Sequence, residues 1–495
     1  MVYLVGAGPG DPELLTLKGR RALEKASVVL YDNLAPEQVL AFAPPGALRV
    51  YVGKKRSRHA YSQEEICAML IDHARSGKTV VRLKGGDPYL FGRGGEEAEA
   101  LFAAGIPFQV IPGVTAAAGI AAYSGVPLTH RAHASAVSIV TGHDADAMDW
   151  SRFSNSDTLV ILMGLTNFAE IARRLIACGR PPDTPALAVR WGTRPDQETL
   201  GGTLETLPGL VESRGMKPPA TFFVGEVARL QQHLNWFERL PLFGQRIVIT
   251  RPREQAAGLA EMLRDLGAQP IEFPVIQIDP ASDYGPLDRA IETLEDYDWL
   301  VFTSVNGVRA FFERLALSRR DLRGLRAKLA AIGPATREAL ERAHLKVDEV
   351  GDEFVAESLA AAIAKHSVAG AAVLLVRAAV AREFLPESLR DRGARVDVVE
   401  AYRTSPAAGL EERARELEAH SPDWITFTSS STVDSFFAAV DAHKVSAARL
   451  ASIGPVTSAR LRSATAQKPA LEPTVEAQEY TVEGLLHAIL SEYNR

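Results

Sequence analysis

The second half of the chain repeats itself, and this repeat restricts the possible folds more than any other feature of the sequence. Four short segments recur at offsets of 126, 126, 125 and 121 residues; the first copies start at Ile247, Gly267, Asp298 and Ala331, and the second copies at Val373, Gly393, Asp423 and Ser452. A nearly constant offset indicates two related structural units. Because each unit alternates strand-like and helix-like runs, we predict two similar α/β domains that face one another. Loops rich in Ser and Thr would follow their strands and line a cleft.

The first half of the chain alternates buried strand-like runs with helical stretches, which predicts a parallel sheet with helices on its faces. The predicted strands are Val2–Val5, Val28–Tyr31, Val80–Leu83 and Phe108–Ile111, and the predicted helices are Glu13–Lys25, Gln63–Arg75 and Glu96–Ala104. After about Arg131, strands with fewer helices between them predict a second α/β subdomain: Val137–Thr141, Thr158–Met163, Ala186–Trp191, Glu198–Thr203 and Thr221–Val224. We therefore expect domains at 1–240 (subdomains 1–130 and 131–240) and 246–495, joined by a linker at 241–245.

The charge balance and the cysteine count argue against several classes of protein. The 495 residues carry 55 Lys and Arg against 61 Asp and Glu, a net charge of −6, whereas nucleic-acid-binding proteins are usually basic. Cys67 and Cys178 form no C-x-x-C pair, so we expect no disulfide framework, no metal and a reducing, cytoplasmic location. The first residues do not resemble a signal peptide. Residues 100–129 carry no charge, but Pro and Gly interrupt them, so we expect no membrane span.

The first of three glycine-rich loops spans residues 6–12. It fails as a dinucleotide-binding G-x-G-x-x-G motif because Asp11 stands at the sixth position and Pro9 interrupts the turn. Asp11 as N-cap and Pro12 at the first helical position are sufficient reasons for a helix start. The three glycines and Pro9 instead favour a backbone that a ligand approaches closely.

The second and third loops follow the predicted strands that end near residues 83 and 111. From Gly85 to Gly95, six residues are Gly or Pro; this favours either a turn before a capped helix or a ligand pocket in which Asp87 reaches hydroxyl or amine groups. No Lys-Ser/Thr pair follows, which excludes a P-loop. Residues 112–118 open a helix of small residues, either for close packing or as a pocket wall with the Thr115 hydroxyl.

Charged residues gather at the ends of the same strands. Asp32 follows a buried strand, as a turn residue or as a functional carboxylate. Basic residues form either a solvated face or a site for a polyanionic small molecule: Lys54, Lys55, Arg56, Arg58, Arg82, Lys84, Arg93, His130 and Arg131.

In order and spacing, these segments resemble the uroporphyrinogen-III C-methyltransferase family over about residues 1–240. The resemblance rests on residues 5–11, 52–54, 83–88, 112–116, 127–131, 163–164 and 192–193. One position differs conservatively: Leu90 stands where relatives often have Ile. The resemblance implies two α/β domains, a homodimer and S-adenosylmethionine (SAM) bound between the domains. Carried over residue by residue, it makes Asp32 the proton acceptor and Lys54 the proton donor. The implied SAM contacts are Pro9, Gly85, Gly86, Asp87, Leu90, Thr115, Ala116, Met163 and Gly192.

The chemistry of that family suits these residue types. Uroporphyrinogen III is an electron-rich tetrapyrrole with eight carboxylates, so a basic rim would suit it. Catalysis needs two positioned molecules and a carboxylate that removes a proton. Methylation at C2 and C7 would give precorrin-2. Precorrin-2 feeds siroheme or cobalamin, and the sequence does not decide between them.

Residues from about 245 to 495 are similar to uroporphyrinogen-III synthase. This similarity rests on residues 250–252, 302–304, 332–334, 399–402, 427–429 and 453–457. The resemblance implies two flavodoxin-like domains, one inserted in the other, that close hydroxymethylbilane with inversion of ring D and without metal or cofactor. Tyr402 is the candidate for helping the hydroxyl group leave, or it is an ordinary half-buried strand residue. The candidate substrate-binding residues are Arg251, Thr303, Ser304, Ser429 and Thr457.

The two resemblances support each other, because the product of the synthase is the substrate of the methyltransferase. Two alternatives stay open at this point. The first half could methylate another substrate, or the second half could hold or sense a tetrapyrrole without closing it. No segment resembles the dehydrogenase and iron-inserting part of fused siroheme enzymes, so we expect the reaction sequence to stop at precorrin-2.

Overall fold

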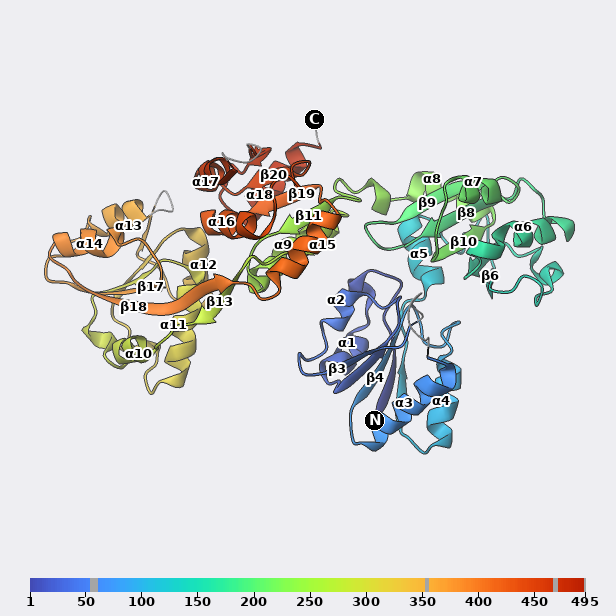
Figure 1. Ribbon diagram of the computed structural model, residues 1–495, viewed down its shortest axis with the longest axis horizontal. Helices are drawn as coiled ribbons and strands as arrows, with labels where there is room; N and C mark the ends of the chain where they lie inside the picture. Colours follow the sequence, from blue (N-terminus) through green and yellow to red (C-terminus); the bar gives the residue numbers. More distant parts are fainter. Residues whose placement is uncertain (54–60, 352–355, 466–470, 494–495) are drawn as a thin grey trace. The chain divides into compact units, whose positions relative to one another are not determined.

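The structure is a computed structural model that describes residues 1–53, 61–351, 356–465 and 471–493. The chain separates into two compact units (Figure 1). The first comprises Met1–Gln245 with Arg264–Gln269, and the second comprises Arg246–Leu263 with Pro270–Arg495. Both units contain parallel strands flanked by helices, so the predicted α/β class is confirmed.

The first sheet of the first unit is entirely parallel, with strand order β3-β2-β4-β1-β5. The strands are β1 (Val2–Gly6), β2 (Val28–Tyr31), β3 (Leu48–Tyr51), β4 (Val80–Lys84) and β5 (Phe108–Ile111). Helices α1 (Leu17–Glu24) and α2 (Glu37–Leu40) cover one face, and α3 (Gln63–Arg75) and α4 (Gly94–Ala103) cover the other (Figure 1). The direction of winding reverses between β1 and β4, and ligands of open parallel sheets bind at such a switch point, beyond the carboxyl ends of the strands.

The second sheet of this unit is mixed, with order β6-β7-β10-β8-β9 and a single parallel pair, β6 with β7. The strands are β6 (Val137–Thr141), β7 (Thr158–Leu162), β8 (Pro185–Arg190), β9 (Glu198–Thr203) and β10 (Ala220–Val224). Helices α6 (Phe168–Ala177) and α7 (Leu207–Ser213) pack on one face. Helix α5 (Ala116–Ser124), which follows β5, packs on the other face and so connects the two subdomains. Helix α8 (Gln231–Leu234) follows β10.

The second unit contains two sheets, a five-stranded sheet of order β12-β11-β19-β20-β21 and a six-stranded sheet of order β13-β18-β17-β14-β15-β16. The strands are β11 (Arg246–Ile249), β12 (Gln269–Glu272), β13 (Ile276–Pro280), β14 (Trp299–Phe302), β15 (Lys328–Ala331), β16 (Glu349–Val350), β17 (Ala372–Ala378), β18 (Arg395–Pro406), β19 (Trp424–Phe427), β20 (Arg449–Ser452) and β21 (Val475–Glu476). The chain enters the six-stranded sheet through β13 and leaves it through β18, and these two strands pair antiparallel. The six-stranded domain is thus inserted into the five-stranded one.

Helices follow most strands of the second unit. They are α9 (Arg253–Asp265), α10 (Gly285–Glu292), α11 (Val305–Leu317), α12 (Pro334–Arg342), α13 (Ala356–Ile363), α14 (Phe384–Asp391), α15 (Leu410–Ala419), α16 (Ser430–Ala439), α17 (Pro455–Thr465) and α18 (Val482–Ser491). Short 3₁₀ helices of the whole chain are Pro12–Leu14, Trp150–Phe153, Leu165–Asn167, Glu226–Leu230, Phe237–Arg239, Leu294–Asp296 and Leu322–Gly324.

The internal repeat corresponds to equivalent strands, but a repeat copy is not a domain. β11 matches β17, β12 matches β18, β14 matches β19 and β15 matches β20 in the two strand orders. The first copy gives β11 and β12 to the five-stranded sheet and β14 and β15 to the six-stranded sheet, and the second copy does the reverse. The boundaries of the repeat copies therefore do not coincide with the boundaries of the two domains. The sheets form between copies because β11 pairs with β19 and β14 pairs with β17.

Two local predictions were also incomplete. The predicted helix Glu13–Lys25 is interrupted: Asp11 caps a 3₁₀ turn, and α1 begins only after Thr16, whose Oγ1 accepts a hydrogen bond from Gly19 N at 3.1 Å. The edge strand β3 and the short α2 were not predicted. In the described ranges, none of the helices has the length and apolar character needed to cross a lipid bilayer.

Candidate active sites

The chain segments at the ends of β1, β4 and β5 meet at Gly6, Gly86 and Gly113; there is no space for a side chain at Gly6 or Gly113, and Gly86 has a positive φ of 66°. A Cβ atom on Gly6 would lie 2.5 Å from the Gly86 carbonyl oxygen, and one on Gly113 would lie 2.2 Å from the same oxygen. Gly8 and Gly86 also exchange backbone hydrogen bonds, at 3.3 Å from Gly8 N and 2.7 Å from Gly86 N. The glycines that predicted a ligand thus allow these three loops to approach one another closely.

Asp87 fixes this junction with both oxygens of its carboxylate. Oδ1 accepts a hydrogen bond from Tyr89 N at 2.8 Å, and Oδ2 accepts one from Gly113 N at 3.0 Å. Bonds of this kind to an ionised carboxylate are stronger than those between neutral groups. Asp87 therefore ties the loop after β4 to the loop after β5, a shaping role that the sequence did not reveal.

Four further predicted cofactor residues surround α5. Thr115 is its N-cap, with Oγ1 accepting from Ala117 N at 3.4 Å, and Ala116 is its first residue. A Cβ atom on Gly119, within α5, would lie 2.6 Å from Pro9 Cγ. Gly192, from the loop after β8, faces the same helix, because its Cβ atom would lie 2.6 Å from the side chain of Ile120.

The remaining predicted cofactor residues lie in the loops after β4 and β7. Gly85 packs against Leu34, since its Cβ atom would lie 2.5 Å from Leu34 Cβ. Leu90 is half-buried, and Met163 is 53% exposed at the end of β7. The loop after β5 and the loop after β8 therefore both contribute to the region around α5.

Asp11 connects the first loop to α5 and to the second sheet. Its Oδ2 accepts a hydrogen bond from Tyr123 OH at 2.6 Å, and its backbone N–H donates to Thr193 Oγ1 at 3.0 Å. Burial, and then the hydrogen bond to Asp11, raise the pKa of Tyr123. Sequence reasoning placed Asp11 as a helix cap and gave no role to Tyr123 or Thr193. The pair Gly192-Thr193 was the available signal, but only through a resemblance.

The connection continues from Thr193 into the end of the first unit. Thr193 N donates to Gln197 Oε1 at 2.9 Å, and Gln197 Nε2 donates to Glu238 Oε1 at 2.8 Å. Glu238 also accepts from Thr199 Oγ1 at 2.5 Å and from Asn235 Nδ2 at 2.9 Å. A polar network with this many satisfied groups holds a single arrangement of the loops.

Three residues at the carboxyl ends of β7 and β8 have positive φ angles although none is glycine. They are Met163 (57°), Trp191 (48°) and Thr193 (69°). A β-branched residue such as Thr rarely adopts this conformation. Backbone strain of this kind concentrates at functional sites, where surrounding contacts enforce it. Two of the three residues belong to the segments expected to surround the cofactor.

Asp32 lies beside buried cations at the carboxyl end of β2. Its side chain is 27% exposed, Oδ1 accepts from Leu34 N at 3.1 Å, and Oδ2 is 3.5 Å from Arg82 NH2. The prediction that Arg82 and Lys84 belong to a basic rim is wrong, because both are 4% exposed. Their side chains point from β4 into the core under α3 and α4, where both form ion pairs with Glu97.

The other residues of the predicted rim differ in their availability. Arg93, His130 and Arg131 are all exposed, and Arg93 pairs with Glu96 at 2.6 Å. The predicted proton donor Lys54 lies outside the described residues, as do Lys55, Arg56 and Arg58. Tyr51, at the end of β3, is near Asp32: burial raises its pKa, and the charge of Asp32 adds to this.

In the second unit, Tyr402 contacts one of the Ser- and Thr-bearing loops that were predicted to line a cleft. Its hydroxyl is 3.0 Å from Ser304 Oγ, and Ser304 caps α11 by accepting from Gly307 N at 3.1 Å. β18 carries Tyr402 and the loop after β14 carries Ser304, so two candidate residues about 100 positions apart meet. Thr303 is half-buried next to them, and its N–H donates to Val376 O at 3.4 Å.

Arg251 also reaches toward α11 through one intermediate side chain. Arg251 NH2 donates to Gln255 Oε1 at 3.1 Å, and Gln255 Nε2 donates to Asn306 Oδ1 at 3.1 Å. Burial lowers the pKa of the Arg251 guanidinium, and the carboxylate of Glu483 opposes this effect. Gln255 and Asn306 were not singled out from the sequence, and no motif marked them.

The other two substrate candidates belong to the five-stranded domain. Ser429 caps α16 and accepts from Thr432 N at 3.3 Å, which is the same role that Ser304 has at α11. Thr457 lies inside α17 and is 5% exposed, so its hydroxyl has little access to a substrate in this conformation. The structure brings Tyr402 and Ser304 together with Thr303 adjacent, whereas Ser429 lies at the start of α16 and Thr457 lies within α17.

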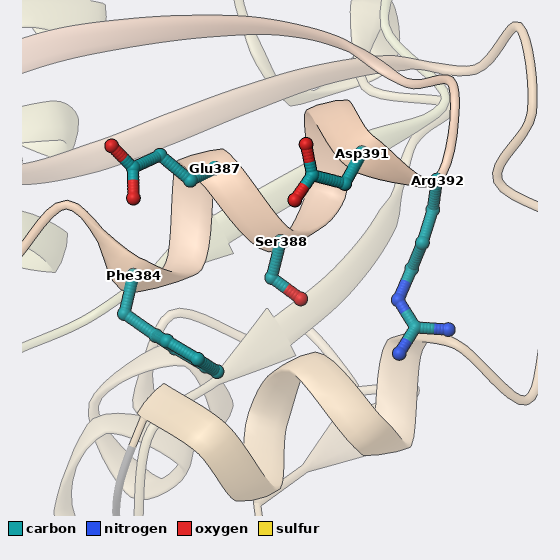
Figure 2. A pocket seen from close by; sticks show the side chains of 5 residues that line it. All are labelled: Phe384, Glu387, Ser388, Asp391 and Arg392. Carbon is teal, nitrogen blue, oxygen red and sulfur yellow. The ribbon is translucent and has the colours of Figure 1, made fainter.

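A hollow on the second unit lies apart from all of these residues. Side chains of α14 and the residue after it line it (Figure 2): Phe384, Glu387, Ser388, Asp391 and Arg392. Two of the five are carboxylates one helical turn apart, and none was predicted as a site residue. Over the described part of the chain, no group of three or more His, Cys, Asp or Glu could hold a metal ion.

Comparison with known families identifies one match in each half. Residues 1–208 match the family described as Tetrapyrrole (Corrin/Porphyrin) Methylases, and residues 257–487 match Uroporphyrinogen-III synthase HemD.

Individual proteins are similar to this chain over different shares of its length. Porphyrin biosynthesis protein HemD of Ruminiclostridium josui is 38% identical over 89% of this chain and 88% of its own length. Uroporphyrinogen-III C-methyltransferase of Bacillus subtilis is 41% identical over 69% of this chain and 71% of its own. The crystal structure of uroporphyrin-III C-methyl transferase from Thermus thermophilus complexed with S-adenyl homocysteine is 46% identical over 46% of this chain and 99% of its own, with a TM-score of 0.41.

Proposed function

The chain belongs to the tetrapyrrole methylase family in its first half and to the uroporphyrinogen-III synthase family in its second, and on this premise we propose one bifunctional enzyme that acts in sequence. The second half closes hydroxymethylbilane to uroporphyrinogen III. The first half then methylates that product at C2 and C7 with SAM and releases precorrin-2. The fusion of a synthase with a C-methyltransferase places both activities on one chain.

The observation that carries the methyltransferase assignment is the junction of Gly6, Gly86 and Gly113 at the switch point of the first sheet. Asp87 fixes this junction, and α5 carries Thr115 at its N-terminus beside it. Backbone groups of these loops are thereby fixed at the carboxyl ends of the strands, where a nucleoside-sized molecule binds. We assign SAM to this place, with Pro9, Gly85, Leu90, Ala116, Met163 and Gly192 completing its surroundings.

SAM supplies an electrophilic methyl group on a positively charged sulfur. A pyrrole carbon of the substrate attacks that methyl carbon in line: the new C–C bond forms, the C–S bond breaks and its electron pair stays on sulfur. The substrate must then lose a proton, which Asp32 accepts. Arg82 and Leu34 N–H hold the two oxygens of Asp32 and fix the direction of its carboxylate. We assign the proton-donor role to Lys54.

The synthase site is proposed around Tyr402. Closure requires that the hydroxyl group of hydroxymethylbilane leaves, and the Tyr402–Ser304 pair offers a proton donor within a hydrogen-bonded pair of hydroxyls. Arg251 offers a partly desolvated cation for a substrate carboxylate. Thr303, Ser429 and Thr457 are the further substrate-binding candidates, and the proposed reaction needs neither a metal nor a cofactor.

The remaining assignments concern the location, the oligomeric state and the partners of the enzyme. We propose a cytoplasmic homodimer that associates through the methyltransferase half and has no nucleic-acid or membrane partner. The net charge of −6 supports the absence of nucleic acid. Light scattering on the full chain tests the dimer, and a single mass equal to one chain would contradict it.

Product analysis from hydroxymethylbilane, with and without SAM, tests the proposed sequence of reactions. We expect uroporphyrinogen III without SAM and precorrin-2 with it. If the full chain yields only the type I isomer that forms spontaneously, the second half binds a tetrapyrrole without closing it. If uroporphyrinogen III accumulates unmethylated in the presence of SAM, the first assignment fails.

The Asp32→Asn variant tests the base. An amide cannot accept the proton, so methyl transfer in a single turnover should slow by about 10²–10⁴-fold while S-adenosylhomocysteine still binds. Asp183→Asn is the matched control, because Asp183 is an exposed residue in the turn before β8. A wild-type rate for Asp32→Asn would make Asp32 a turn residue only.

A further inference from the structure

Four charged side chains gather in a core that is otherwise apolar. Strands β1, β2 and β4 and helices α3 and α4 enclose a cluster of Val, Leu, Ile and Ala side chains. At its carboxyl end lie Arg82, Lys84 and Glu97, which are 4%, 4% and 0% exposed, and Asp32 at the border to solvent. Two cations thus face two carboxylates, and only Asp32 has substantial access to the outside.

Glu97 is the centre of this cluster. Its Oε1 accepts hydrogen bonds from Lys84 Nζ at 2.7 Å, from Arg82 Nε at 3.1 Å and from Gln63 Nε2 at 3.3 Å. Its Oε2 is buried and has no hydrogen-bond partner among the residues that the structure describes. Burial, and second the charge of Arg82, lower the pKa of Lys84, which shows how strongly this site is desolvated.

Arg82 is placed between the two carboxylates. Its Nε faces Glu97, NH1 donates to Leu83 O at 3.0 Å, and NH2 faces Asp32 Oδ2 at 3.5 Å. The guanidinium is planar, so fixing Nε and NH1 also fixes the direction of NH2. Glu97 from α4 and the Leu83 carbonyl from β4 therefore fix the orientation of Arg82 together, and through it the direction of the charge offered to Asp32.

Stability alone does not explain this cluster. Burying charged groups costs solvation free energy, and the attraction between the buried charges often does not offset this cost. Replacing a buried ion pair by well-packed apolar residues of similar volume is therefore often neutral or stabilising for the fold. The Oε2 atom of Glu97, buried and without a hydrogen bond to any described residue, adds a further unfavourable contribution. Departures from an apolar core of this kind are expected at functional sites.

We propose that Glu97 is a positioning residue for the methyl-transfer reaction: it holds Arg82 so that the guanidinium orients Asp32 toward the substrate. This inference rests on the proposed role of Asp32 as the base. Glu97 itself is fully buried and touches neither substrate nor SAM. Its effect reaches the reaction only through Arg82 and Asp32.

The Glu97→Gln variant removes the negative charge and keeps the size of the side chain. Misdirection of a catalytic group by about 1 Å can cost on the order of 100-fold in rate, so we expect the single-turnover rate of methyl transfer to fall by about 10- to 100-fold. The affinity for S-adenosylhomocysteine, measured by calorimetric titration, should stay within about twofold of wild type, a change well below the tenfold that marks a lost contact. Glu99→Gln is the matched control on the same helix, since Glu99 is an exposed glutamate of α4.

A double-mutant cycle separates positioning from a general structural effect. In the Asp32→Asn background, Glu97→Gln should cause no further loss of rate, because its path to the reaction is already interrupted. An independent, multiplicative loss would overturn the proposal, and so would a wild-type rate of Glu97→Gln. A wild-type rate of Asp32→Asn alone would instead refute the proposed base.

Thermal melting of the full chain shows whether Glu97→Gln folds. If it does not fold, a second variant tests the positioning role of Glu97. Arg82→Lys keeps the charge balance but lacks the planar fork that reaches both carboxylates. It should lower the single-turnover rate and leave the Michaelis constant for uroporphyrinogen III unchanged. An unchanged rate, or a loss confined to the Michaelis constant, would overturn the proposal.

Discussion

Replacing Gly113 by alanine tests whether the glycine junction shapes the SAM site. In the native backbone the new Cβ atom would lie 2.2 Å from the Gly86 carbonyl oxygen and 2.7 Å from Gly6 Cα. Contacts of a Cβ atom below 3.0 Å do not occur, so the loops must separate by at least 0.8 Å, which is 3.0 minus 2.2. All the nearby atoms belong to the backbone, so no flexible side chain can absorb the shift.

The expected magnitude follows from this overlap. Overpacking at a rigid site costs about 1–3 kcal/mol. A domain of this size loses about 2–4 °C in melting temperature for each kcal/mol, so the first unit should melt about 2–12 °C lower. The shift also pulls Gly113 N away from Asp87 Oδ2, which is 3.0 Å distant in the native loop. With the pocket distorted, affinity for S-adenosylhomocysteine should fall by about tenfold or more, equivalent to about 1.4 kcal/mol.

Thermal melting and calorimetric titration of the full chain measure both effects. Gly209→Ala is the control, because Gly209 lies in α7 and a Cβ atom there meets nothing within 4 Å. This change should stabilise the helix by up to about 1 kcal/mol and leave ligand affinity unchanged. If Gly113→Ala bound S-adenosylhomocysteine as tightly as wild type and melted at the same temperature, the argument from close backbone approach would be refuted.

Three further predictions address other parts of the molecule. Thr193→Val keeps the branched shape but removes the acceptor of the Asp11 N–H, so affinity for S-adenosylhomocysteine should fall by about tenfold, the equivalent of one unsatisfied buried donor; Thr193→Ser, which retains the hydroxyl, should bind normally. Tyr402→Phe should slow closure of hydroxymethylbilane and let the type I isomer accumulate, while methylation of supplied uroporphyrinogen III stays unchanged; a normal isomer ratio and rate would contradict the role. Burial, and then the hydrogen bond to Asp397, raise the pKa of Tyr297 from 10.0 to about 12, so the free energy of unfolding lost in Tyr297→Phe should be largest below pH 10 and shrink as the pH rises toward 12.

The sequence was sufficient to predict that glycine-rich loops at the ends of three strands lie at one edge of the first sheet. The loops after β1, β4 and β5 each carry glycines, and parallel strands bring their carboxyl ends to one edge of the sheet. Local pattern therefore implied that distant loops meet. What the glycines contact was not predictable, because a Gly-rich loop looks the same whether a ligand or another backbone approaches it. The structure places backbone against Gly6 and Gly113.

The charged residues show more clearly that the sequence does not reveal what a side chain contacts. In the sequence, Arg82 and Lys84 resemble Arg93 and Arg131 as members of a basic set. Burial separates them: the first two point into the core, whereas Arg131 is exposed. Alternation along a strand predicts that Arg82 and Lys84 share a face, but only the packing of α4 brings Glu97 to that face.

The repeat of the second half shows which features of the fold the sequence determines and which depend on tertiary structure. The segment pattern determined which strands are equivalent, because each copy encodes the same succession of buried strands and turns. It did not determine which strands share a sheet. β11 pairs with β19 and β14 pairs with β17, so each sheet combines strands from both copies. Strand pairing depends on backbone groups that every residue carries, and the choice of partner is made by packing between segments far apart in the chain, which local sequence does not encode.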